Sequence, residues 1–256
     1  MLTMPSAPNN LVHVSHVDGV ATCTLNRPDA RNALSLAMIE AMHVALDEII
    51  AIDGLRVLVM AGNGKSFCAG MDLKAVQHDP RAMGEMLEQL AAFNTRLRRV
   101  EVPTIARVQG AAIGGGCGLM VVCDFSITHP EAKLGYPEVD LGICPAVIAP
   151  WLIKRIGAGR ARAMLLAGGT MSGEAGHHAG LATHLVAEDQ LEHATAELAG
   201  RLCKGGPEAL AATKSWLNEL DGSLDDALLQ KGAEISARMI QSDEAQERLR
   251  AVFGGT

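Results

Sequence analysis

The chemistry that this chain most clearly offers comes from backbone amides in a cluster of glycines. In the stretch GAAIGGGCG, residues 110–118, five of the nine residues are glycine, and an apolar run follows. Glycine loses more conformational freedom on folding than any other residue. Such a cluster therefore marks backbone that approaches a ligand closely or adopts angles closed to other residues. We expect a binding site here.

A second glycine-rich segment, AGNGKSFCAGMDL at residues 61–73, also follows a short apolar run. Both segments lead from an expected strand into helical or irregular backbone, where amide N–H groups lack partners. Free amides at a helix N-terminus favour negative charge. Two of them directed at one carbonyl oxygen would stabilise an enolate or a tetrahedral oxyanion. Taken alone, the glycines are equally compatible with close packing of helices on strands.

Motifs for other chemistries do not fit the sequence. The segment GKS at 64–66 lacks the preceding glycine that a phosphate-binding P-loop requires, because residue 59 is Val. The dinucleotide fingerprint fails at Leu119, where a glycine is needed. There is no G-x-S-x-G nucleophile motif, and the histidines of 177–184, in a helix-like stretch, have no zinc-binding pattern. We expect no metal.

Composition limits the classes of protein that the chain can belong to. Its 256 residues are 48% hydrophobic and 20% charged, which is typical of one compact soluble domain. The net charge is −7 with no long basic stripe, which argues against nucleic-acid binding. No apolar run reaches membrane-spanning length, and the first ten residues lack a secretory pattern. Six cysteines without a C-x-x-C pair indicate reduced thiols and a cytoplasmic location.

Strand and helix patterns alternate along the first half of the chain. A D-G turn at residues 18–19 between alternating segments predicts a hairpin. Apolar spacing predicts helices over 35–52, with Ser35 as N-cap, and over 80–100. Short apolar runs predict further strands at 55–60, 102–108 and 125–128, with a short extended piece near AKLGY. This order predicts an α/β layered fold with mainly parallel strands. From Ala146 onward the pattern is almost wholly helical.

Five motifs, taken together, resemble the enoyl-CoA hydratase/isomerase (crotonase) superfamily over nearly the whole chain. They are NRPDARNAL (26–34), GKSFCAGMDL (64–73), VQGAAIGGGCGLMVVCDF (108–125), LGYPEVDLGICP (134–145) and SDEAQERLRAVF (242–253).

The resemblance implies a fold, an assembly and a class of substrate. The fold would be a repeated ββα superhelix at 1–200, carrying the coenzyme A and oxyanion site. A C-terminal helical trimerisation region at 201–256 would pack on this core or on a neighbouring subunit. The protein would form a homotrimer or a dimer of trimers. It would act on acyl-CoA thioesters with no cofactor beyond the coenzyme A of the substrate itself.

The resemblance also implies roles for individual residues. The oxyanion donors would be the backbone N–H groups of Met71 and Gly115, and the catalytic carboxylate would be Glu138. A glutamate facing an apolar pocket suits proton transfer at the carbon α to the thioester. The residues that would shape the coenzyme A pocket are Cys68, Ala69, Gly70, Asp72, Leu73 and Lys74. The acyl pocket would draw on the variable stretch 75–95 and on the C-terminal helices.

One departure from the family pattern leaves the reaction open. Two-carboxylate hydratases have Glu where this chain has Gly118, and Asp140, on an expected extended segment, would point elsewhere. Some hydratases of branched glutaconyl-type esters share this glycine and the PAVI-x-P run at 145–150. This resemblance favours hydration of a 2-enoyl-CoA, with a branched glutaconyl-type ester as one candidate substrate. A Δ3,Δ2-enoyl-CoA isomerase, which needs a single base, is the alternative. A non-catalytic acyl-CoA-binding protein is a third interpretation.

Overall fold

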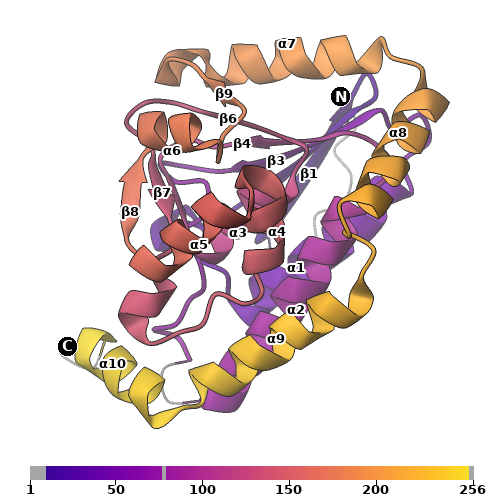
Figure 1. The fold of residues 1–256 in the computed structure, drawn as a ribbon. Coiled ribbons are helices and arrows are strands. Elements are labelled where there is room, and N and C mark those ends of the chain that lie inside the picture. The colour runs from indigo at the N-terminus through magenta and orange to yellow at the C-terminus, as the bar shows by residue number, and fades with distance from the viewer. Residues whose placement is uncertain (1–9, 77–78, 254–256) are drawn as a thin grey trace.

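The computed structural model describes residues 10–76 and 79–253 and has two sheets (Figure 1). The main sheet has six strands in the order β1-β2-β3-β4-β6-β9. They are β1 Val12–Val17, β2 Val20–Leu25, β3 Val57–Gly62, β4 Thr104–Arg107, β6 Phe125–Thr128 and β9 His184–Leu185. The smaller sheet, in the order β5-β7-β8, contains β5 Ala111–Ile113, β7 Lys133–Gly135 and β8 Thr170–Ser172. The main sheet is parallel except for the β1–β2 pair.

The antiparallel pair β1–β2 is the predicted hairpin. Asp18 and Gly19 have φ angles of 50° and 81°, and Val17 pairs directly with Val20. A two-residue loop with positive φ at both positions matches the right-handed twist of the strands, which is why D-G predicts this turn.

The predicted ββα repeat is confirmed. Strand β4 lies in the main sheet, β5 lies in the smaller sheet, and helix α3 (Gly115–Val122) follows. The next repeat places β6 and β7 in the same two sheets and then leads to α4 (Ala149–Ile156). Single bridges from Cys68 to Ala112 and from Leu34 to Met71 extend the second layer to the earlier repeats. The glycine-rich turns of successive repeats are therefore neighbours in space.

Three long helices lie side by side below the sheets (Figure 1). They are α1 (Leu36–Ile50), α2 (Pro80–Arg98) and α9 (Asp226–Ile240), and α2 packs against both of the others. Ser35 is the N-cap of α1, as predicted, and its hydroxyl accepts a hydrogen bond from the Met38 amide at 3.2 Å. Helix α9 thus brings the C-terminal part of the chain against its own core.

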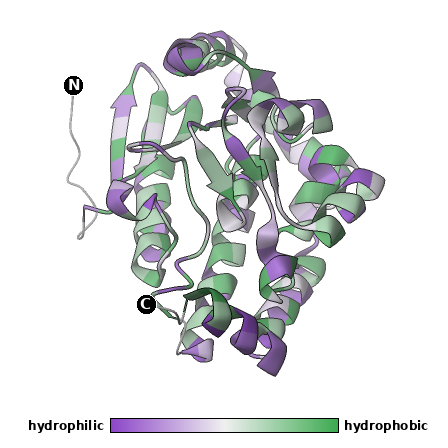
Figure 2. Ribbon diagram, turned by 90° about the vertical axis from the view of Figure 1, so that its left-hand side faces the viewer, coloured by the Kyte–Doolittle hydropathy of each residue, from purple (hydrophilic) through white to green (hydrophobic). Residues whose placement is uncertain are grey.

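The second half is less uniformly helical than the sequence pattern predicts. Its other helices are α5 (Ala158–Ala167), α6 (Gly173–Ala179), α7 (Leu191–Cys203), α8 (Pro207–Leu220) and α10 (Asp243–Phe253). Strands β8 and β9 interrupt them, and His184 lies in β9 rather than in a helix. These strands have only three and two residues, too few to show an alternating pattern. Green predominates on the central strands in Figure 2, and purple gathers on the outer helices.

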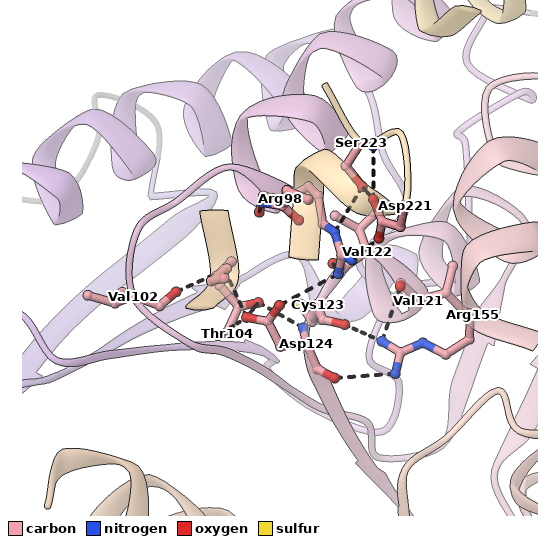
Figure 3. Close-up of polar contacts among 12 residues, drawn as sticks. Arg98, Val102, Thr104, Val121, Val122, Cys123, Asp124, Arg155, Asp221 and Ser223 are labelled. Carbon is pink, nitrogen blue, oxygen red and sulfur yellow. Dashed lines mark hydrogen bonds and ion pairs between the residues drawn. The ribbon is translucent and has the colours of Figure 1, made fainter. Parts of the chain in front are cut away.

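A partly buried ionic cluster ties the C-terminal helices to the sheet (Figure 3). The carboxylate of Asp124 lies 2.8 Å from the Lys214 ammonium and 3.6 Å from the Arg98 guanidinium. Arg98 also pairs with Asp221 at 2.7 Å. The cluster joins the ends of α2 and α3 to α8. The division of the chain at residue 200, which falls within α7, stays a prediction.

The described helices include none that is both long and apolar enough to cross a bilayer.

Candidate active site

A cavity of about 150 Å³ lies where the two glycine-rich turns meet. Its walls include Met71 from the first turn, Gly114 and Gly115 from the second, and Glu138. Residues of α2 and of the C-terminal helices complete it, among them Leu87, Ile240 and Phe253. The stretch 75–95 and the C-terminal helices thus line this cavity, and their contact with an acyl group stays a prediction.

The two predicted amide donors flank this cavity. Leu34 N–H donates to Gly70 C=O at 2.8 Å, and Asp72 N–H donates to Leu34 C=O at 3.0 Å. Because amides alternate in direction along extended backbone, the intervening Met71 N–H lies on the other side. Gly115 is the first residue of α3, so its N–H has no partner within the helix. The hydrogen bonds of residues 10–76 and 79–253 use neither amide.

Two of the glycines let the turns pack against each other. A Cβ on Gly70, whose φ is 91°, would lie 2.7 Å from the Ile113 carbonyl oxygen. A Cβ on Gly116 would lie 2.2 Å from the Cys68 carbonyl oxygen. The Gly115 nitrogen is 3.8 Å from the Cβ position of Gly70. Close packing of the turns thus brings the two free amides to one place. The glycines therefore serve both explanations given above, close packing and an oxyanion site.

Glu138 lies beside these amides as a half-buried residue whose carboxyl end is turned inward. It belongs to a 3₁₀ helix, Pro137–Leu141, and its Oε2 atom is buried with no hydrogen-bond partner among the described residues. Burial raises the pKa of its carboxyl from 4.5 to about 7, with a smaller upward contribution from the charge of Asp140. A carboxyl with this pKa is poised to exchange a proton near neutral pH.

The predicted extended conformation of this segment is wrong. Residues Pro137–Leu141 form a 3₁₀ turn that ends at Gly142, whose φ of 72° suits a left-handed cap. Asp140 is exposed, and its carboxylate accepts a hydrogen bond from the Gly169 amide at 3.0 Å. It therefore points away from the cavity, as predicted, although the cause is the turn and its bond to Gly169.

The six residues predicted to shape the coenzyme A pocket occupy different environments. Ala69, Gly70 and Leu73 line the cavity. Cys68 is fully buried beneath it, and its amide donates to the Ala111 carbonyl at 3.0 Å. The others lie toward the surface: Asp72 pairs with Arg27 at 2.6 Å, and Lys74 is exposed. Contact of these residues with coenzyme A stays a prediction.

The space beside Gly118 is filled by a residue that the sequence did not single out. Side-chain carbons of Ile148 lie 3.2 to 3.9 Å from the point where a Cβ on Gly118 would be. Ile148 is the N-cap residue of α4 and lines the cavity. A hydrocarbon side chain thus occupies the place from which a second carboxylate would extend. Ile148 is part of the PAVI run that the sequence analysis noted. That it packs against Gly118 becomes visible only in the folded structure.

The far end of α3 is held by a guanidinium group (Figure 3). Arg155, from α4, donates to the carbonyl oxygens of Val121 at 3.1 Å and Asp124 at 3.3 Å, and also to that of Cys123. A guanidinium group at a helix C-terminus donates to carbonyls that have no partner in the helix. Its positive charge also interacts favourably with the negative end of the helix dipole. Helix α3, whose N-terminal amide faces the cavity, is thereby fixed at its other end.

Comparison with known proteins agrees with this fold. Residues 15–253 match the family Enoyl-CoA hydratase/isomerase. An enoyl-CoA hydratase of Mycobacterium tuberculosis is 31% identical over 98% of this chain and 96% of its own. The 2,3-dehydroadipyl-CoA hydratase of Escherichia coli is 30% identical over 93% of both chains. A solved enoyl-CoA hydratase from Mycobacterium avium has a TM-score of 0.85 at 30% identity, covering 96% of this chain and 97% of that one.

An α/β superhelix has two free amides and a buried carboxyl around one cavity. This arrangement is typical of enzymes that stabilise an oxyanion while a carboxyl moves a proton. The match over residues 15–253 gives the family: the chain belongs to the enoyl-CoA hydratase/isomerase, or crotonase, family.

Proposed function

We propose that the protein hydrates a 2-enoyl-CoA thioester in the cavity between the two glycine-rich turns. The observation that carries this proposal is the buried, unpartnered carboxyl of Glu138 beside the free amides of Met71 and Gly115. Several relatives that match most of this chain are named as hydratases, which supports the same reaction.

The chemistry of hydration matches these groups. The N–H groups of Met71 and Gly115 bind the thioester oxygen and stabilise the negative charge that develops there. The carboxylate of Glu138 takes a proton from water as the water oxygen bonds to C3. The resulting carboxylic acid gives a proton to C2, which yields the 3-hydroxyacyl-CoA and restores the carboxylate. One carboxyl therefore acts as base and then as acid.

Isomerisation of a 3-enoyl-CoA to a 2-enoyl-CoA is a second candidate, favoured by the pairing of Ile148 with Gly118. With no second carboxylate at this place, Glu138 would carry a proton between C2 and C4 while the same amides hold the enolate oxygen. The two reactions differ in their use of water. Purified protein is given hex-2-enoyl-CoA or hex-3-enoyl-CoA: hydration lowers the absorbance of the conjugated thioester, and isomerisation raises it.

The variant Glu138→Gln tests whether the site is catalytic. We expect turnover to fall by about 10³-fold or more, the upper part of the range for general acid–base groups, with binding of acyl-CoA retained. Glu197→Gln, an exposed glutamate on α7, is the matched control. Turnover that survives Glu138→Gln would contradict the proposal. Binding without turnover in the unmodified protein would favour the non-catalytic interpretation.

Coenzyme A enters this proposal only as part of the substrate, and the reaction as written needs no other cofactor. Assembly as a homotrimer or a dimer of trimers stays a prediction, and light scattering during gel filtration measures it.

A further inference from the structure

One wall of the cavity consists of hydrocarbon side chains. It is lined by Leu87 from α2, by Ile240 from α9, and by Ile143 and Val147 from the loop that precedes α4. These side chains belong to one buried cluster with Leu73, Met83 and Leu249. Among the described residues that line the cavity there is no Lys, Arg or His. An acyl chain extending from the two amides would meet hydrocarbon.

The polar groups on this wall are already engaged. The Ser236 hydroxyl, on α9, donates to the Cys144 carbonyl at 2.9 Å and accepts from the Val147 amide at 3.2 Å. Its single proton is therefore committed to the loop. The Cys144 thiol also lines the cavity, and burial raises its pKa, so it stays neutral. Neither group can balance a negative charge on a substrate.

Glu138 adds a further penalty for an anionic acyl chain. Its carboxyl is the one acidic side chain among the described lining residues, and it is already desolvated. A second carboxylate in a cavity of about 150 Å³ would repel the ionised form of Glu138 at short range. The second charge would also be buried without a counter-ion, which proteins avoid because it is costly.

The volume of the cavity matches that of a short acyl chain. An apolar protein cavity of about 150 Å³ binds benzene, a ligand of six carbons. The present cavity has the same volume, and Met71 and Gly115, whose amides would hold the thioester oxygen, are among the residues that line it.

We propose that this site takes an uncharged hydrocarbon acyl group of about six carbons and excludes acyl groups that end in a carboxylate, glutaconyl and dehydroadipyl groups included. This inference rests on the proposed function, because it assumes that the thioester binds in this cavity. On this inference, the substrate of this chain differs from that of the Escherichia coli relative named for dehydroadipyl-CoA. The inference also argues against the branched glutaconyl-type substrate that the PAVI-x-P run suggested.

The first experiment compares two saturated thioesters that differ in one charged group. Hexanoyl-CoA and adipyl-CoA both carry six acyl carbons, and calorimetry gives their Kd values. We expect adipyl-CoA to bind about 100-fold more weakly or worse. Equal affinities, or a preference for adipyl-CoA, would overturn the inference. Because neither compound reacts, this result does not depend on whether the protein is a hydratase.

Turnover then separates the inference from the proposed function. Hex-2-enoyl-CoA should exceed 2,3-dehydroadipyl-CoA in kcat/KM by about 100-fold. Preferred binding of hexanoyl-CoA without turnover of any enoyl-CoA would contradict the proposed function and leave the inference standing. Efficient hydration of 2,3-dehydroadipyl-CoA would overturn the inference and support the function.

A variant of the hydrocarbon wall tests the limit on length. Ile240→Ala removes three carbons from a fully buried position and should improve binding of decanoyl-CoA at least tenfold relative to hexanoyl-CoA. Leu228→Ala, at an exposed position of the same helix, is the control and should leave the ratio unchanged. Retained hexanoyl-CoA binding demonstrates that the variant is folded. An unchanged ratio in Ile240→Ala would contradict the placement of the chain against α9.

Discussion

The carboxylate oxygen Oε1 of Glu138 lies 2.8 Å from the point where a Cβ on Gly114 would be. Gly114 has φ 53° and ψ −121°, a conformation that is essentially open to glycine alone, and it directly precedes the first residue of α3. The catalytic acid of the proposed reaction thus rests against the backbone that carries one of its amide donors. Absence of a side chain at this position sets the spacing between the two groups.

Gly114→Ala should therefore impair the site twice, by straining the backbone and by displacing the Glu138 carboxylate. We expect kcat to fall by about 100-fold or more, since displacement of a reacting group by about 1 Å has an effect of this size. Steady-state kinetics with hex-2-enoyl-CoA measures it. Gly200→Ala is the control, because a Cβ there meets no atom within 4 Å and the residue lies in α7. Full activity in Gly114→Ala would contradict this account of the spacing.

Local signals predicted the elements around the site well. Three predicted features depend on interactions within a few residues, and each is confirmed. They are the D-G hairpin, the Ser35 cap and the long helix α2. The glycine cluster correctly indicated close backbone approach, because glycine is costly wherever it is not needed. Motif resemblance placed Met71, Gly115 and Glu138, and the structure brings them to one cavity.

Most of the errors and omissions concern contacts between distant parts of the chain, and one concerns a local signal. The pairing of Gly118 with Ile148 joins residues thirty positions apart and leaves no local pattern. Strand β9 exists because two residues pair with β6, far earlier in the sequence. The 3₁₀ turn that carries Glu138 is capped by Gly142, a local signal that the sequence analysis did not use.

The raised pKa of Glu138 predicts the pH dependence of turnover. The carboxyl must be ionised to accept a proton from water, and its pKa is about 7. We expect kcat/KM to rise about tenfold per pH unit below this value and to level off above it, because this parameter reports the free enzyme. A profile that is flat between pH 5 and pH 7 would show that another group is the base.

The same raised pKa means that Glu138 lowers the free energy of unfolding at high pH. From pH 4.5 to about 7 the folded state retains a proton that the unfolded chain releases, so stability falls as the pH rises. Glu138→Gln lacks this penalty and should be more stable than the unmodified protein at pH 8 by up to about 3 kcal/mol, at about 1.4 kcal/mol per unit. The difference should vanish below pH 4.5. Urea unfolding at both pH values measures it, and an equal difference at both would contradict burial as the cause.

A second carboxylate can be introduced only if its space is freed. Gly118→Glu alone would force its side chain against Ile148, whose nearest carbon is 3.2 Å from the new Cβ, and we expect lower stability by about 1–3 kcal/mol. The double variant Gly118→Glu with Ile148→Gly removes the obstructing side chain. It should recover stability relative to the single variant and hydrate hex-2-enoyl-CoA faster. Thermal unfolding and kcat are measured together, and Ile148→Gly alone is the control. Equal stability of the single and double variants would contradict the packing that we describe.

Arg155 positions α3 from the end opposite the cavity. Arg155→Met keeps most of the hydrocarbon stem but leaves the carbonyls of Val121 and Asp124 without this donor, and we expect a loss of about 2–4 kcal/mol. Because the helix that bears the Gly115 amide loses its anchor, kcat should fall more than KM changes. Arg155→Lys, which keeps the charge but not the planar group, should recover part of both properties. Arg162→Met, at an exposed position of α5, is the matched control. If Arg155→Met lowered stability and left kcat unchanged at a temperature where the variant is folded, the guanidinium would stabilise the fold without positioning the amide.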